Sequence, residues 1–283
     1  MTIAFYLQNN VEILDFAGPL EVFNYAGFEV FTVSKTTNRI KAQGVLTVQP
    51  DYSIANAPKA DIIAFFGGNS SEAADDPEVI GWLRKQDPKF YFSVCTGAFM
   101  LAKAGLLDGK TATTFHDELD RLEMSFPEIK VMKNVRFVDN GNVITTAGVS
   151  AGIDGALHLV ARIKGIDKAR KTAYYMEYDK WMPGEGLILC EENPYQNLKN
   201  YEQLAEFEGK YEFSTGEKIQ LKLNHREKGL EMIRNDRVYP LFSDTKDRFQ
   251  DVNDKDLVFD REEQGKITGF VIEGDEKTFT KVD

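Results

Sequence analysis

The sequence has little cysteine and histidine and no long hydrophobic run. Its 283 residues include two cysteines, Cys95 and Cys190, which are too few for a disulfide framework. The cysteines and the three histidines are scattered without zinc-binding spacing, and no P-loop or dinucleotide-binding fingerprint is present. No apolar run approaches the roughly 20 residues that span a bilayer, and the N-terminus lacks the pattern of a signal peptide. We therefore expect a cytoplasmic protein without a metal, a cofactor or a membrane partner.

Basic residues are also in deficit. The chain has 34 Lys and Arg against 45 Asp and Glu, which gives a net charge of −11, and no basic stripe offsets this acidity. The balance argues against a nucleic-acid partner. By contrast, 42% of the residues are hydrophobic, which is enough for a sizeable core, and the length suits two domains.

The first 184 residues alternate short apolar strands with amphipathic helices. Continuous apolar strands such as 62–66 are typical of a parallel sheet that is covered on both faces. Pro19 and Pro77 stand where the first turn of a helix tolerates proline. The pattern predicts a three-layer α/β domain over residues 1–184. The predicted strands are 3–7, 28–34, 61–66, 90–94 and 143–146, and the predicted helices are 19–25, 77–86, 97–104, 117–125, 151–164 and 167–178.

The pattern changes after Pro183. Residues 185–204 are rich in Glu, Asn and Tyr and have little periodicity, so we expect a linker there. From residue 205 to residue 283, short alternating segments are separated by turn signals such as Asn235-Asp236 and Gly274-Asp275. This part predicts a small antiparallel all-β domain, either a sheet or a half-barrel. It contains no recognisable catalytic pattern.

Cys95 has the most informative surroundings in the sequence. The apolar run 90–94 ends on this cysteine, and a helical pattern follows at once through Thr96 and Gly97. A strand, a sharp turn and a helix are the layout of a nucleophile elbow. The N-terminus of the helix is expected to favour the thiolate, which is the reactive form of cysteine. The alternative is a buried free cysteine that closes a core strand.

Partners for Cys95 are expected at the carboxyl ends of the other strands, where ligands bind in open α/β sheets. Asp15 and Glu21 follow the first predicted strand, and a carboxylate there is either a proton carrier or a helix cap. Gly67 and Gly68 follow the third, where their backbone N–H groups can form an anion-binding nest. The N–H of Thr96 is a second candidate donor to a negatively charged intermediate.

Several motifs together resemble a known family over residues 1 to about 181. They are Leu14-Asp15-Phe-Ala-Gly-Pro19, Phe66-Gly67-Gly68, Cys95-Thr96-Gly97-Ala98, the run from Ala104 to Thr114 and the run from Thr146 to Asp154. The chain thus resembles the ThiJ/PfpI superfamily, which implies a flavodoxin-like, class I glutamine amidotransferase-like fold and a homodimer. The motifs are most similar to those of isonitrile hydratases and of sensor-like domains in transcription regulators. The resemblance implies that Cys95 is the nucleophile, Asp15 its carboxylate partner and Thr96 a neighbouring hydroxyl and amide donor.

The chain also departs from relatives in this superfamily. PfpI-type proteases have His directly after the nucleophilic cysteine, where this chain has Thr96, which argues against protease activity. His116 is displaced by one place from the histidine of many relatives, so it is only a possible pocket residue, like Glu21. His158 lies four residues after Asp154, a spacing that favours packing or a contact between the two. The C-terminal part resembles small all-β domains of unknown function that are appended to β-lactamase-like and other bacterial proteins.

The sequence is compatible with three functions. The first is a cysteine-dependent hydratase or hydrolase of a small carbon electrophile, with the hydration of an isonitrile to an N-formamide as the leading case. The second keeps Cys95 as the nucleophile in a glyoxalase-like or amidase-like enzyme, because one fold hosts many sites. The third is a sensor of small molecules or oxidants that does not turn its ligand over.

Overall fold

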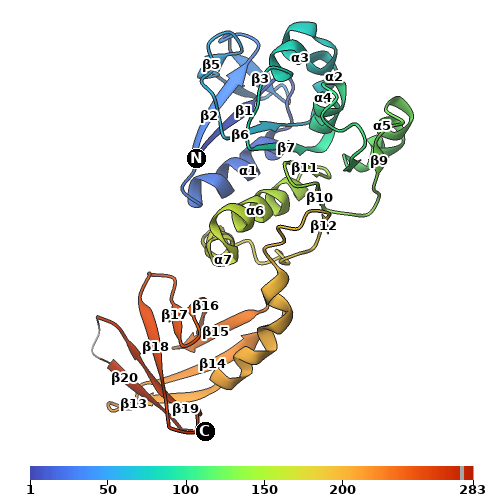
Figure 1. Cartoon of the computed structure of the whole chain (residues 1–283). Coiled ribbons are helices and arrows are strands. Elements are labelled where there is room, and N and C mark those ends of the chain that lie inside the picture. Colours follow the sequence, from blue (N-terminus) through green and yellow to red (C-terminus); the bar gives the residue numbers. More distant parts are fainter. Residues whose placement is uncertain (275–276, 283) are drawn as a thin grey trace. The chain divides into compact units, whose positions relative to one another are not determined.

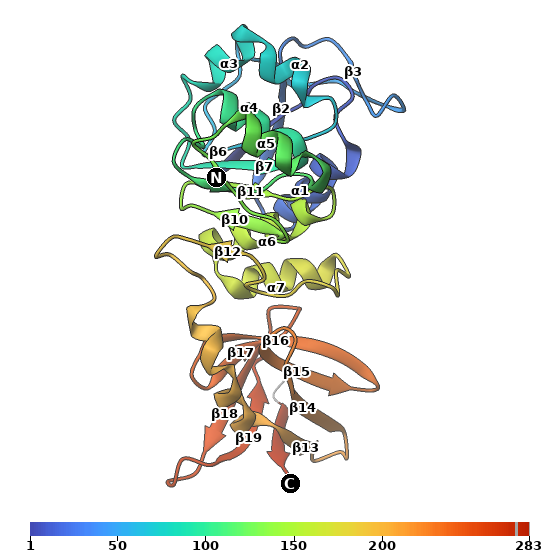
Figure 2. The same cartoon turned by 90° about the vertical axis from the view of Figure 1, so that its right-hand side faces the viewer.

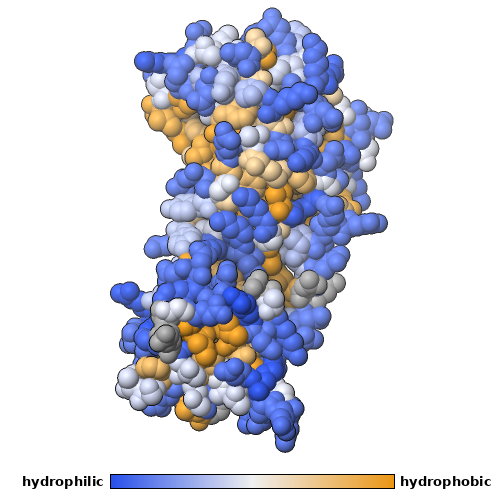
Figure 3. Space-filling model, turned by 60° about the vertical axis from the view of Figure 1, so that its left-hand side comes forward, coloured by the Kyte–Doolittle hydropathy of each residue, from blue (hydrophilic) through white to orange (hydrophobic). Residues whose placement is uncertain are grey.

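The computed structural model describes residues 1–274 and 277–282. The chain forms two compact units. The first comprises residues 1–163 and 184–193, and the second comprises residues 164–183 and 194–283 (Figure 1). Residues 164–183, which the sequence analysis placed in the first domain, thus group with the C-terminal residues. The visible face in Figure 3 is mostly hydrophilic, with smaller hydrophobic areas on it.

The first unit is built on one eight-stranded sheet with the order β12-β10-β11-β7-β6-β1-β2-β5. All neighbouring strands are parallel except β10 and β11, which are antiparallel. The strands are β1 (Thr2–Tyr6), β2 (Glu29–Ser34), β5 (Tyr52–Ser53), β6 (Ile62–Phe65), β7 (Phe90–Val94), β10 (Phe137–Asp139), β11 (Val143–Thr146) and β12 (Leu187–Ile188). The registers Tyr6↔Phe65, Phe65↔Ser93 and Val94↔Thr146 align the ends of the central strands, so the segments after β1, β6 and β7 leave the sheet at one edge.

Helices cover both faces of this sheet (Figure 1). On one face, residues of α2, α3 and α4 pack with Tyr6 and Phe65 in a single apolar cluster. On the other face, Phe23 of α1 and Gly155 of α6 both contact Phe92. The elements are α1 (Ile13–Tyr25), α2 (Ser70–Asp75), α3 (Pro77–Leu83), the 3₁₀ helix η1 (Cys95–Gly97), α4 (Ala98–Lys103), η2 (His116–Glu118), α5 (Leu119–Ser125) and α6 (Ala151–Lys164). The predicted three-layer fold with a parallel sheet is confirmed.

The start of α1 corrects one prediction. The helix begins at Ile13, so Pro19 lies inside it rather than in its first turn. Proline there removes one backbone donor, while Phe16 and Val22 of the same helix are buried in the core. As a result, Asp15 lies within the first turn of α1 instead of before the helix. The sequence pattern also did not predict the strands β5 and β10 of the main sheet, the helix α2, or the short strands β3 (Ile40–Ala42), β4 (Leu46–Val48), β8 (Thr111–Ala112) and β9 (Lys130–Val131).

The second unit is a closed antiparallel barrel of eight strands, with α7 (Ile166–Tyr175) packed against β16 (Figure 2). Pairing of β13 with β20 closes the barrel, which is more than the sheet or half-barrel that the sequence predicts. Buried aromatic rings such as Tyr211, Phe259 and Phe270 fill the interior. The strands are β13 (Gly209–Phe213), β14 (Lys218–Asn224), β15 (Gly229–Arg234), β16 (Arg237–Thr245), β17 (Arg248–Gln250), β18 (Asp256–Arg261), β19 (Ile267–Ile272) and β20 (Lys277–Lys281).

The stretch that we expected to be a linker is partly ordered. It contains β12, which pairs with β10 in the first unit, and the beginning of the 3₁₀ helix η3 (Gln196–Phe207). Tyr195 and Leu198 are buried there. Although residues 185–204 are polar in composition, a few apolar side chains among them pack in the protein interior.

Candidate functional site

Cys95 occupies a strained turn between β7 and α4. Its backbone φ is +58°, which places a residue with a Cβ in the left-handed region, while Val94 before it is extended. Backbone strain of this kind is found at functional sites that surrounding structure holds in place. Gly97 makes the turn possible, because a Cβ at this position would overlap the carbonyl oxygen of Phe65 at the end of β6. The predicted strand, elbow and helix are therefore present.

The backbone of Cys95 is fixed by buried hydrogen bonds. The Cys95 N–H donates to the carbonyl oxygen of Ala147 (3.1 Å), and the Thr114 hydroxyl donates to the Cys95 carbonyl oxygen (2.7 Å). On the helix side, the Thr96 hydroxyl donates to the carbonyl oxygen of Gly68 (3.3 Å). These bonds hold the sulfur-bearing residue in its unfavourable conformation. The roles of Thr114 and Ala147 could not be predicted from the sequence, because their contributions depend on tertiary packing.

Asp15 lies beside Cys95 and is fully buried. One carboxylate oxygen, Oδ2, accepts the Gly67 N–H (2.8 Å), and the other, Oδ1, accepts the N–H of Val149 (3.1 Å). The backbone of Gly67 lies against both functional groups: a Cβ on it would be 2.7 Å from both Asp15 Oδ2 and Cys95 Sγ. Only glycine leaves room for the thiol and the carboxylate under this backbone.

The two side chains have strongly shifted acidities. Burial raises the pKa of Asp15 to about 7, with a further contribution from Glu12, against the hydrogen bonds of Gly67, Cys95 and Val149. Burial and the adjacent Asp15 carboxylate raise the pKa of Cys95 to about 12. The Thr96 N–H at the start of the helix lowers the pKa of the thiol, as expected, but desolvation and the carboxylate outweigh it, so the resting Cys95 is a thiol. The raised pKa of Asp15 agrees with the role of a proton carrier.

The structure brings some of the predicted site residues together and leaves others apart. Asp15, Gly67 and Cys95 are in mutual contact, and Thr96 adjoins them. However, the Gly67 N–H is taken by Asp15 and is not free to bind an anionic intermediate. Gly68 has a φ of +88° and pairs with Val11 in an isolated bridge, so it shapes the loop above the site.

The two possible pocket residues lie outside this group. Glu21 is exposed on α1, whereas Asp15 belongs to the buried side of that helix. His116 is also exposed, and its side chain contacts Asp117 (3.2 Å) and the ring of Phe115. Neither observation connects these two side chains to the thiol.

Val149 is a site residue that the sequence analysis missed. Its φ is +50°, which is a rare and strained conformation for a β-branched side chain. This conformation directs its N–H to Asp15. The only sequence signal was its place in the motif 146–154, since an apolar side chain gives no hint that its backbone serves a carboxylate.

A second polar cluster lies at the opposite edge of the sheet. Buried Asp139 accepts a hydrogen bond from His158 Nε2 (2.7 Å) and pairs with Arg162 (3.0 Å), and the Cys190 thiol lies 3.5 Å from it. Asp154, four residues before His158 on α6, pairs with Arg136. Burial alone would raise the pKa of Asp139, but the bonds from His158 and the charge of Arg162 leave it below its usual value.

Within residues 1–274 and 277–282, no group of three or more His, Cys, Asp or Glu side chains is arranged to hold a metal ion. The same residues include no helix that is long and apolar enough to cross a membrane.

Comparison with known proteins identifies the family. The model of the DJ-1/PfpI family matches residues 1–162. Isonitrile hydratase from Pseudomonas putida is 32% identical over 185 residues, which cover 63% of this chain and 78% of that protein. A crystal structure of a ThiJ/PfpI family protein from Pseudomonas syringae aligns with a TM-score of 0.59 and 27% identity, covering 73% of this chain and 86% of the other.

Transcription regulators are also among the relatives. The HTH-type transcriptional regulator CdhR of Pseudomonas aeruginosa is 31% identical over 152 residues, which are 52% of this chain and 45% of the regulator. The chain thus matches about half the length of such regulators, and its predicted lack of a nucleic-acid partner stays a prediction. The match to the family model and the similarity to the hydratase both extend over more than half of this sequence, and the chain belongs to the DJ-1/PfpI family.

Proposed function

We propose that this protein is an enzyme that hydrates a small carbon electrophile through Cys95, with an isonitrile as substrate and an N-formamide as product. The observation that carries the proposal is the buried pair of Cys95 and Asp15 beneath Gly67. The similarity of this chain to the isonitrile hydratase of Pseudomonas putida supports the choice of substrate.

The acidities of the pair suggest how it works. With a thiol pKa of about 12 and a carboxyl pKa of about 7, the resting pair at neutral pH and above is a neutral thiol beside a carboxylate. Asp15 then acts as the base that takes the thiol proton as sulfur attacks. Because Asp15 takes the proton only as the sulfur attacks, no free thiolate has to form in this buried site, where it would be unfavourable.

The reaction balances in two steps. In the first, Cys95 Sγ forms a bond to the terminal carbon of the isonitrile, and Asp15 passes the thiol proton to the same carbon, which gives a thioimidate. In the second, Asp15 takes a proton from water as the water oxygen attacks that carbon, and the proton goes to the nitrogen. The carbon–sulfur bond then breaks, the sulfur recovers the hydroxyl proton, and the formamide leaves. The Thr96 N–H, next to the sulfur, is the donor we assign to the charge that develops on the adduct.

The geometry also favours a slender substrate. Cys95 is 6% exposed, so a bulky carbonyl compound has little access to the sulfur. An isonitrile is linear at its reacting end and presents a terminal carbon with no other substituent. This fits a thiol that is covered by the loop of Gly67 better than a branched substrate does.

Turnover of a small alkyl or aryl isonitrile by the wild type, Cys95→Ala and Asp15→Asn tests the proposal. We expect formamide from the wild type and none above background from either variant, with Cys190→Ala as the matched cysteine control that keeps full activity. Formamide production by folded Cys95→Ala would refute the nucleophile. No turnover by the wild type would refute the substrate.

The sensor alternative is supported by the regulator relatives. It predicts saturable ligand binding or oxidation of Cys95 without product release. The glyoxalase-like and amidase-like alternatives predict turnover of an α-oxoaldehyde or an amide that also depends on Cys95. The substrate that the wild type turns over separates these two alternatives from the leading proposal, and product formation by the wild type separates the sensor alternative. We further propose a homodimer, for which light scattering should give twice the mass of one chain.

A further inference from the structure

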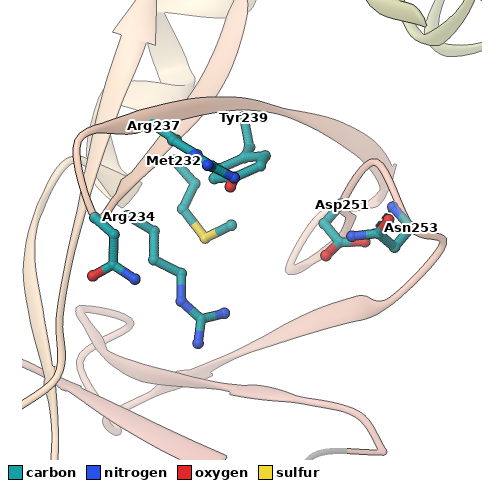
Figure 4. Close-up of a pocket in the computed structure, with 7 residues that line it drawn as sticks. Met232, Arg234, Arg237, Tyr239, Asp251 and Asn253 are labelled. Atoms are coloured by element: carbon teal, nitrogen blue, oxygen red, sulfur yellow. Dashed lines mark hydrogen bonds between the residues drawn. The ribbon is translucent and has the colours of Figure 1, made fainter.

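The barrel contains a cavity of about 480 Å³ that the proposed reaction does not use. Figure 4 shows Met232, Arg237 and Tyr239 from the β15–β16 hairpin lying across from Asp251 and Asn253 of the loop between β17 and β18. A cavity of this size accommodates a small metabolite, and the mouths of barrels are common places for such ligands.

The strand register explains which side chains point into this cavity. In the β15–β16 hairpin, Leu230 pairs with Leu241, Met232 with Tyr239 and Arg234 with Arg237. The two leucines and Met232 belong to the buried core of the barrel. Since alternate residues of a strand share a face, both arginines continue this inward-facing column to the mouth.

These arginines lie directly opposite each other on neighbouring strands, where like charges are destabilising. Arg234 pairs with Glu217, but Glu217 also pairs with Lys277 (3.4 Å), so one carboxylate serves two cations. Among residues 1–274 and 277–282, no ion pair involves Arg237.

The one acidic side chain across the cavity does not offset this charge. The Oδ1 atom of Asp251 accepts the backbone N–H groups of Asn253 (2.7 Å) and Lys255 (3.0 Å), which ties the carboxylate to its own loop. Two arginines thus line the cavity against one carboxylate, in a chain whose net charge is −11.

We propose that this cavity binds a small organic anion, a carboxylate or a phosphate ester, whose charged end contacts Arg237 and Arg234. The guanidinium fork matches both kinds of anion. The apolar part of the ligand lies against Met232 and the ring of Tyr239, which also line the cavity. Binding would relieve the repulsion between the paired arginines. This proposal does not depend on the function of Cys95.

The test follows the methyl NMR signal of Met232 in the full chain, with the signal assigned by Met232→Leu. Benzoate and phenyl phosphate are the two anionic probes, and benzamide is the neutral control of similar shape. We expect a saturable shift with at least one anion and none with benzamide. The relative affinities of the two anions distinguish a carboxylate ligand from a phosphate ligand. Absence of a shift with both anions, or an equal shift with benzamide, would overturn the proposal.

Variants give the second arm of this test. Arg237→Gln is expected to weaken anion binding about tenfold or more, because a hydrogen-bonded charge is lost. Arg226→Gln, in the β14–β15 turn and paired with Glu227, is the matched control and should bind as the wild type does. Arg234→Gln should also weaken binding and serves if Arg237→Gln does not fold. Unchanged affinity in the folded variants of both cavity arginines, or an equal loss in the control, would contradict the assignment.

Discussion

Asp15 and Asp139 are both fully buried in the same α/β unit, and each lies next to one of the two cysteines. Their environments differ in one respect. Asp139 is surrounded by Arg162, His158 and the N–H of Gly141, whereas Asp15 receives only backbone N–H groups and the thiol. The pKa is lowered for Asp139 and raised to about 7 for Asp15. A buried carboxylate with its own cations is a structural group, while one without them can exchange a proton near neutral pH.

Replacing each carboxylate by its amide should have the largest effects, on activity for Asp15 and on stability for Asp139. Asp15→Asn removes the proton carrier, so we expect kcat/KM for an isonitrile to fall by about 10²–10⁴-fold. Asp139→Asn leaves Arg162 buried without its main charge partner and should lower the free energy of unfolding by about 3–5 kcal/mol. Initial rates normalised to folded protein and urea denaturation measure the two effects.

Each substitution should lower one of the two properties and leave the other unchanged. Asp139→Asn should retain the kcat/KM of its folded fraction, and Asp15→Asn should unfold at a urea concentration no lower than the wild type at pH 8. If Asp139→Asn lost activity while folded, the edge of the sheet with Cys190 would take part in catalysis. Equal destabilisation by both substitutions would show that Asp15 is structural too.

Part of this site could be predicted from sequence. The apolar strand that ends on Cys95 and passes through Thr96 and Gly97 into a helix is a local pattern, and it predicted the elbow. Asp15 was predicted as a partner because it follows a neighbouring strand. The acidities could not be predicted in the same way, because they depend on how much water the folded chain excludes. Closure of the barrel was missed because β13 and β20 are distant in sequence.

The two carboxylates should also give opposite pH dependences of stability. The pKa of Asp15 is raised from 3.8 to about 7. Below pH 3.8 its carboxyl group is neutral in both the folded and the unfolded chain and does not destabilise the fold. The free energy of unfolding then falls as the pH rises from 3.8 to about 7, because the unfolded chain loses this proton first. The loss is on the order of 4 kcal/mol. For Asp139, whose pKa is lowered, the stabilisation is present above its unfolded pKa and is lost as the pH falls through the folded value.

Urea denaturation of the wild type, Asp15→Asn and Asp139→Asn from pH 2 to pH 8 measures these dependences, because the change for Asp139 lies below its unfolded pKa of 3.8. We expect Asp15→Asn to lack the decline toward neutral pH. In the wild type, kcat/KM should rise with an apparent pKa of about 7 and then stay level, since the pair must hold one proton and the thiol keeps it up to about pH 12. A rate that falls between pH 6 and pH 8 would contradict the role of Asp15 as a base.

The smallest effect is expected at Val149, whose backbone N–H donates to Asp15 and has no counterpart of this strained kind at Asp139. Val149→Gly relieves the strain of a φ of +50° by about 1 kcal/mol, and the greater freedom of glycine in the unfolded chain offsets part of this gain. Because the N–H then holds Asp15 less rigidly, we expect a modest decrease in kcat and a higher apparent pKa in the rate profile. Glu177→Gly, at a φ of +51° in the second unit, is the control for strain relief alone. A change of stability in both variants but of the rate profile only in Val149→Gly would show that the strained turn serves the carboxylate. An unchanged profile would mean that Gly67 alone positions Asp15.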